Sequence, residues 1–443
     1  MVQGKYKSKM KILLIIIKTF SFCFLILLVL AFFALSTSPI INKDLVLTPK
    51  KTQIAEQIIK NSWKNVLSTS PYLNIEINQS ELDAILAVIT HTIPSLKLEI
   101  RTSNFGAIIL ASIPLNKNVN IFINASCLFA PNEKALEIEY CNIGSLPLSG
   151  TLMQFLLNSF SFVLIDTVTQ ETIKQLMQGV YITENKITLS VPKNYNFKAQ
   201  IESSFRSISS TTISLSKPTE VNTERVMFYI NKLKSVKQNT KKLAFYIGKL
   251  FYFVRMESAH RSPIEENTAA IWALAITFGE PSFASYINIR EKIELPGYKP
   301  TTLRGRGDLV LHFLYSVILE QMSNTNIGLN IGELKELLDT NNGGSGYSFA
   351  DLAADKAGLM FSSKLTTSTE QAIYAQNLLA NTNNENIFFP AINKLPEGLQ
   401  ENEFKKLFNN INSPEYKKQT QYIDRIISKL ALYNDQYKVL NEN

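Results

Sequence analysis

The sequence is poor in the residues that carry most enzyme chemistry. Its 443 residues include three histidines, three cysteines and two tryptophans. It has no H-E-x-x-H, P-loop or dinucleotide-binding pattern, so the commonest metalloprotease and nucleotide-binding motifs are excluded. Gly344-Ser345-Gly346 is not the nucleophile elbow of a serine hydrolase, because position 347 is Tyr where that motif needs Gly. No cofactor is expected from these patterns.

Charge is scarce as well. Charged residues make up 19% and apolar residues 45% of the chain, which is typical of packed domains and not of a disordered chain. The net charge of +8 arises largely from five lysines that precede residue 19, and the rest of the chain is close to balanced. An overall basic character of this origin does not indicate a nucleic-acid partner.

One long apolar run stands out, over residues 12–35, with Lys18 as its only charge. Its 24 residues exceed the roughly 20 that a helix needs to cross a bilayer, so the run predicts a transmembrane helix. The lysines before it place a cytoplasmic tail at 1–11 and the rest of the chain outside the cytoplasm. We therefore expect a single-pass inner-membrane protein with a periplasmic bulk and the membrane as a partner. A cleaved signal peptide and a Gram-positive cell surface are the alternatives.

The remainder divides by pattern into four parts. Residues 36–52 are predicted as a linker, and 53–202 as an α+β domain with a curved antiparallel sheet. The Ser/Thr-rich stretch 203–219 is a second predicted linker, and 220–443 is expected to be an all-helical domain. The expected strands are 72–77, 96–102, 107–114, 119–129 and 136–141, with a final hairpin at 180–182 and 186–191. A single apolar, buried helix is expected over 151–178.

Cys127 and Cys141 flank a predicted turn at 130–133. A disulfide between them is an open possibility, since the centre of that turn places Cys127 opposite residue 138 or 139 and leaves Cys141 slightly out of register. Two thiols without a neighbouring histidine do not complete a tetrahedral metal site.

Residues 55–195 resemble the YpmS-like membrane-anchored extracellular proteins. The resemblance lies in an x-I-G-x-L-P-L-x-G turn at Cys141 to Gly150 and an I-T-L-S-V-P strand at Ile187 to Pro192. These families are loosely linked to lipid-binding tubular folds, which implies an apolar groove for an amphiphile. An ordinary hydrophobic core is the competing interpretation of the same pattern.

Polar side chains that are able to carry chemistry gather in residues 304–358. Asp308, His312 and Tyr315 share one helix face by their spacing, and Asp351 and Asp355 share another. Glu333 and Glu336 lie between these two helices in the chain, before a Gly-rich turn at 343–346. We expect His312, Glu336, Asp351 and Asp355 to approach one another and to form a buried polar network, a divalent-cation site or an acid/base pair.

This segment also resembles VanZ-like and YfiM-like bacterial envelope proteins. They carry a His-Phe pair, a Glu and a D-x-x-A-D-x-x-G helix, matched here by His312-Phe313, Glu336, and Asp351 with Asp355 and Gly358. Neither family supplies an established reaction.

The expected function is therefore a membrane-anchored, non-enzymatic protein that binds an amphiphile, a lipid or an envelope partner protein. One alternative is a metal-dependent hydrolase of envelope lipid or glycan that uses the 308–355 polar cluster. The other alternative is a scaffold for an envelope complex.

Overall fold

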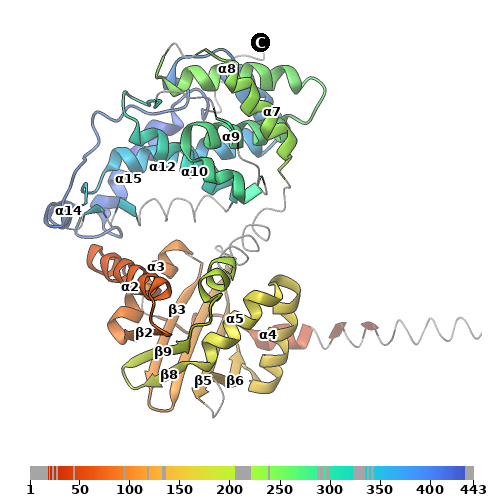
Figure 1. The fold of residues 1–443 in the computed structure, drawn as a ribbon, viewed down its shortest axis with the longest axis vertical. Coiled ribbons are helices and arrows are strands. Elements are labelled where there is room, and N and C mark those ends of the chain that lie inside the picture. The colour runs from red at the N-terminus through yellow and green to blue at the C-terminus, as the bar shows by residue number, and fades with distance from the viewer. Residues whose placement is uncertain are drawn as a thin grey trace, which may run out of the picture. The chain divides into compact units, whose positions relative to one another are not determined.

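The computed structural model divides into two units, which are described separately here (Figure 1). The sheet unit comprises residues 1–45, 58–86 and 95–204, and the helical unit comprises 46–57, 87–94 and 205–443. The structure describes residues 18, 20–21, 24–25, 28–42, 45–93, 95–116, 119–131, 136–204, 221–237, 240–287, 289, 293–295, 300–322, 335–336, 339–340 and 344–434, without the side chains of 116, 119, 131 and 160–164.

The larger sheet of the sheet unit is an antiparallel meander in the order β3-β4-β5-β6-β7. Alternating apolar residues predict its strands, because successive side chains on a strand point to opposite faces. The four predicted runs are present within a few residues, and the fifth strand, β7, was not predicted. The strands are β3 (Lys97–Ser103), β4 (Gly106–Asn116), β5 (Val119–Pro131), β6 (Leu136–Ile143) and β7 (Leu146–Ser149).

The transmembrane helix predicted over 12–35 is contradicted by the structure. No helix in the described part of the chain is long and apolar enough to cross a membrane, so the predicted single-pass inner-membrane topology is not supported. The described helical residues of the run end at Ala34, because Leu35 and Ser36 form β1 (Leu35–Ser36) and pair with Ile123 and Phe122 of β5. Residues 1–17, 19, 22–23 and 26–27 lie outside the described residues.

The segment expected to be a linker, 36–52, is partly built into the fold. Ile41 is only 2% exposed, and the backbone N–H of Ile40 donates to Ser112 Oγ on β4 at 3.0 Å. Asn124 on β5 donates from its amide to the carbonyl of Ser38. These bonds fasten the segment to the sheet and bring Ile41 beside β3, at the cavity described below.

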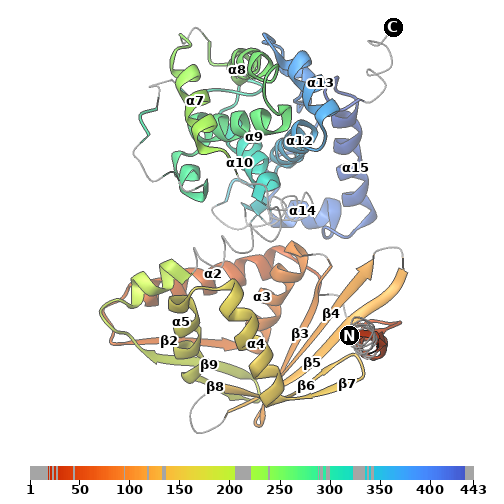
Figure 2. The same ribbon diagram turned by 90° about the vertical axis from the view of Figure 1, so that its right-hand side faces the viewer.

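Two helices replace the single buried helix expected over 151–178. They are α4 (Gly150–Leu164) and α5 (Thr167–Gln178), and Figure 2 shows both lying against the strands. Asp166 separates them, because its carboxylate accepts from the N–H and the hydroxyl of Thr169 and so caps a new helix. Phe155 of α4 is 66% exposed, so this helix is not enclosed on all sides.

A second sheet has the order β2-β9-β8, from β2 (Tyr72–Asn78), β8 (Val180–Thr183) and β9 (Lys186–Pro192). Helix α3 (Gln79–Thr92) begins directly after β2, and helix α2 (Pro49–Leu67) precedes that strand. Asn78 and Glu81 form a reciprocal capping pair, in which each side chain accepts from the other residue's backbone N–H. This cap fixes the first turn of α3, where Gln79 lies. Asp83 follows four residues later, on the same face of the helix.

Cys127 and Cys141 form a disulfide across β5 and β6, with their Cα atoms 4.1 Å apart. The register of these strands shifts by one residue, since Phe129 pairs with Ile138 whereas Leu128 pairs with Tyr140. The shift brings Cys141 directly opposite Cys127, a position that the turn predicted at 130–133 does not give.

The helical unit is built around α9 (Pro263–Leu274), α10 (Asp308–Met322) and α12 (Phe349–Thr366), which lie at its centre (Figure 2). Nearly every residue of α12 is buried. Around these helices lie α7 (Thr223–Lys234), α8 (Leu243–Glu257), α13 (Thr369–Leu379), α14 (Glu401–Phe408) and α15 (Pro414–Ser428), with short turns at Ala275–Gly279, Pro281–Ile287 and Glu385–Ile387.

Two aromatic clusters position the polar residues of this unit. Phe313 on α10 contacts the rings of Phe361, Phe388 and Phe389 at centroid distances of 5.3–5.9 Å. Tyr347, just before α12, packs on Phe404, with ring centroids 4.7 Å apart. The first cluster fixes α10 against α12, and the second fixes the chain that enters α12.

Helices α10 and α12 approach closely at Gly358. A Cβ atom there would lie 2.3 Å from the carbonyl oxygen of Phe313 and 3.0 Å from Ser316 Cβ, which no side chain tolerates without a shift. Only glycine therefore permits this helix pair, and with it the juxtaposition of His312 and Asp355.

Gly358→Ala is expected to lower the free energy of unfolding by about 1–3 kcal/mol, because the methyl group overpacks the helix contact. This loss should exceed the stabilisation that alanine normally brings to a helix interior. Chemical denaturation of the full chain measures the difference. Gly307→Ala is the matched control, since its Cβ would meet only Thr301 O at 3.7 Å. Equal stability of the two variants would contradict the close approach.

Candidate metal site

The helical unit brings His312 of α10 between two aspartates of α12. His312 Nδ1 lies 3.1 Å from Asp355 Oδ1, and Nε2 lies 3.4 Å from Asp351 Oδ2. Asp351 and Asp355 are four residues apart and so share one face of α12, as their spacing predicts. The side chains of all three residues are 5–10% exposed.

Glu336 approaches the same point from a different segment. Its carboxylate oxygen Oε2 accepts from the backbone N–H of Ser348 at 3.0 Å, and Ser348 caps α12 by accepting from Asp351 N. Glu336 therefore lies at the N-terminus of α12, where free backbone N–H groups and the helix dipole stabilise negative charge. Its side chain is completely buried.

Asp355 is incompletely satisfied. Its Oδ1 atom accepts from Ser316 Oγ at 2.9 Å and faces His312, whereas Oδ2 is buried and has no hydrogen-bond partner among the residues that the structure describes. A buried carboxylate oxygen without a partner costs roughly 1–3 kcal/mol or more, so such atoms require an explanation. An ion or a water molecule that binds this oxygen would remove the cost.

Negative charge exceeds positive charge around the cluster. Arg306 contacts Asp308, Asp351 and Glu397, and Lys335 contacts Glu336 and Asp339. With Asp355, six carboxylates are thus linked to two permanently charged cations and one imidazole. The excess creates a negative potential that attracts cations.

Burial and charge shift the protonation of the site. Burial is the main cause that raises the pKa of Glu336 to about 7, with Lys335 opposing it and Asp351 and Asp355 adding to it. Burial also raises the pKa of Asp351, against the charges of His312 and Arg306. Burial lowers the pKa of His312, but its hydrogen bond to Asp355 and the charges of both aspartates outweigh burial and raise it.

Three of these residues offer donor atoms to a single ion. One donor atom each from His312, Glu336 and Asp355 lies within 4.8 Å of the others. A tetrahedral ion with bonds of about 2 Å separates its donors by roughly 3.5 Å. Side-chain movements of about an ångström would bring the donors to this spacing, and Asp355 Oδ2, which bonds to no described residue, is available for this.

The structure thus places all four predicted residues together, but not every neighbour that the spacing suggested. Tyr315 packs on Phe283 instead, with ring centroids 4.9 Å apart, and Glu333 lies outside the described residues. Two further contributors went unpredicted, Ser316 and Arg306. Ser316 follows His312 by four residues, so helical periodicity could have indicated that it shares the face of His312. Arg306 lies two residues before the first residue of α10.

Comparison with known proteins adds no further support: no protein-family model, curated protein or solved structure matches this chain. The resemblances to YpmS-like, VanZ-like and YfiM-like proteins stay predictions. Function must therefore be argued from the chemistry of the site itself.

The raised pKa of Glu336 predicts that the metal-free protein loses stability as the pH rises. The folded state retains the proton up to about pH 7, whereas the unfolded chain releases it near 4.5, so stabilisation that is complete below pH 4.5 disappears by about pH 7. This difference corresponds to about 3 kcal/mol. His312, whose pKa is also raised, contributes with the same sign above pH 6.5.

Glu336→Gln mimics the protonated carboxyl and keeps an acceptor for Ser348 N–H. In EDTA, the variant should therefore be more stable than wild type at pH 8 and equal to it near pH 4.5. Denaturation curves of the full chain between these pH values measure the difference. If the stabilities of the two proteins change with pH in the same way, burial does not raise the pKa of the Glu336 carboxyl.

Proposed function

We propose that this protein binds a divalent cation through His312, Glu336 and Asp355. The observation that carries the proposal is the buried Asp355 Oδ2, which no described residue hydrogen-bonds, within a set of three donors. A polar network that only fixed the packing of α10 on α12 would satisfy all of its atoms. A bound ion supplies the missing partner and offsets the excess of buried carboxylates.

Asp351 acts on this ion indirectly. Metal-bound histidines usually donate their second ring N–H to a carboxylate, which fixes the tautomer and the ring orientation. Here Nδ1 faces Asp355, one of the donors, and Nε2 faces Asp351, which lies outside the donor set. The arrangement suits an ion held by Nδ1 while Nε2–H donates to Asp351. Asp351 is in turn held by Arg306 at 3.1 Å.

The mixed donors favour zinc or manganese over magnesium. Imidazole nitrogen suits Zn²⁺, and carboxylate oxygen suits Zn²⁺ and Mn²⁺. Mg²⁺ dehydrates reluctantly and usually keeps several waters, for which a site with side chains at most 10% exposed has little room. Zn²⁺ should bind more tightly than Mn²⁺, as the general order of affinities predicts.

Hydrolysis by a metal-bound water is the second candidate function. Three protein donors leave one tetrahedral position open, as in catalytic zinc sites, whereas structural sites are closed by four. Substitution with Co²⁺ separates the two roles. A visible spectrum that changes when azide is added indicates an exchangeable fourth position, and an unchanged spectrum indicates a closed, structural ion.

Zinc is expected to stabilise the wild-type protein by mass action, by about 2.7 kcal/mol at a free concentration of 100 times the Kd. Asp355→Asn and His312→Gln should lose most of this gain, because each removes a donor. Thermal unfolding of the full chain, pre-treated with EDTA and titrated with Zn²⁺, Mn²⁺ or Mg²⁺, measures it.

Asp424→Asn serves as the matched control. Asp424 pairs with Lys356 on α12 at 2.6 Å, so the control removes a carboxylate that contacts the same helix but lies outside the donor set. The control should keep the full response to zinc. An absent response in wild type, or an equal response in Asp355→Asn, would refute the proposed site.

A further inference from the structure

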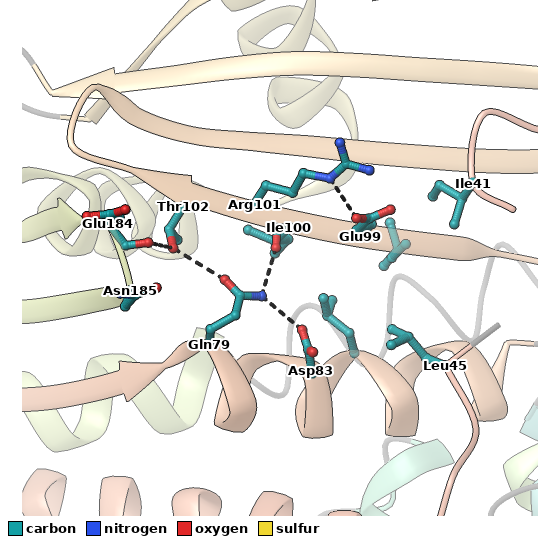
Figure 3. Close-up of a pocket in the computed structure, with 12 residues that line it drawn as sticks. Ile41, Leu45, Gln79, Asp83, Glu99, Ile100, Arg101, Thr102, Glu184 and Asn185 are labelled. Carbon is teal, nitrogen blue, oxygen red and sulfur yellow. Dashed lines mark hydrogen bonds and ion pairs between the residues drawn. The ribbon is translucent and has the colours of Figure 1, made fainter. Parts of the chain in front are cut away.

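A cavity of about 260 Å³ lies in the sheet unit, between α3 and the edge strand β3. Ile41 and Leu45 line one end, and the turn between β8 and β9 lines the other. Figure 3 shows Ile41 and Leu45 at the first end, Glu184 and Asn185 at the second, and Gln79 and Asp83 between them.

A hydrogen-bonded network gives this cavity a fixed polar wall. The amide of Gln79 donates to Asp83 Oδ1 at 2.9 Å and to the carbonyl of Ile100 at 3.1 Å. Thr102 donates its hydroxyl to the Glu184 carbonyl at 2.8 Å, which ties the β8–β9 turn to β3. Groups held in this way are pre-organised, so a ligand would not need to order them.

The polar part of the cavity carries uncompensated negative charge. Arg101 pairs with Glu99 at 2.6 Å, as the dashed line in Figure 3 marks. Asp83 and Glu184 form no ion pair within the part of the chain that the structure describes. One Asp83 oxygen accepts from Gln79, and the Glu184 carboxylate lies on an exposed turn. A ligand that complements these two groups is a hydrogen-bond donor with positive charge.

The other end of the cavity is apolar. Ile41 and Leu86 are 2% and 3% exposed, and Leu45 and Leu98 are half-buried beside them. A ligand that consists of a charged head group alone would make no contact with this apolar end. A short hydrocarbon chain attached to the head group would cover the exposed parts of Leu45 and Leu98, with a gain of about 25 cal/mol for each Å² of apolar surface removed from water.

We propose that this cavity binds a small amphiphile that carries a protonated amine on a short apolar chain. The amine donates to Asp83 in the negative field of Asp83 and Glu184, and the chain extends towards Ile41 and Leu45. The cavity is smaller than the roughly 300–1,000 Å³ of typical drug-sized sites, which limits the ligand to a single short chain. The inference is independent of the metal site, since it concerns the sheet unit alone.

Isothermal titration calorimetry of the full chain with hexylamine tests the proposal. Saturable binding is expected for hexylamine, with weaker or absent binding for methylamine, which lacks the chain, and for hexanol and hexanoate, which lack the positive charge. Hexanoate binding as tight as that of hexylamine, or no hexylamine binding at all, would overturn it.

The double variant Asp83→Asn with Glu184→Gln should weaken hexylamine binding about tenfold, because two charge interactions are lost. Both substitutions keep the size of the side chain, and an unchanged circular dichroism spectrum shows that the fold is retained. Glu139→Gln, an exposed position on β6, is the matched control and should leave the affinity unchanged. Equal affinities of the double variant and wild type would exclude the assigned cavity.

Discussion

The helical unit depends on how it accommodates negative charge between α10 and α12. Asp351, Asp355 and Glu336 are almost fully buried around one imidazole, and like charges in such surroundings repel strongly. The fold reduces the repulsion by raising the pKa values of Glu336 and His312 and by placing Arg306 beside Asp351. The proposed divalent ion would relieve it more completely, because it would also satisfy Asp355 Oδ2, which has no partner in the described part of the chain.

The two candidate sites share an excess of carboxylates but differ in shape, and shape determines their ligands. Donors from His312, Glu336 and Asp355 converge within 4.8 Å, which suits a single compact ion. In the sheet unit the carboxylates of Asp83 and Glu184 come from different elements and border an elongated cavity with an apolar end. An extended organic cation matches that cavity better than a metal ion. The amphiphile expected from the sequence is untested and stays a proposal, whereas the predicted membrane-spanning helix is contradicted.

Local sequence patterns predicted the features that are determined by residues close together in the chain. Strand alternation located β3 to β6, and the spacing of Asp351 and Asp355 placed both on one face of α12. The features that these patterns did not predict depend on contacts between residues far apart in the chain. Hydropathy alone did not reveal that Leu35 pairs with Ile123, and the turn residues did not reveal the register shift that aligns Cys127 with Cys141. The position of Glu336 depends on Ser348 and on the aromatic packing of Tyr347.

The central claim is that His312, Glu336 and Asp355 hold an ion. It is tested most directly by anomalous diffraction from crystals of the full chain grown with Zn²⁺ and measured on both sides of the zinc absorption edge. The account predicts one strong anomalous peak about 2 Å from a ring nitrogen of His312 and from carboxylate oxygens of Glu336 and Asp355. Density for an ordered water on Asp355 Oδ2, with no anomalous signal there, would contradict it and leave a hydrated polar network in place of a metal site.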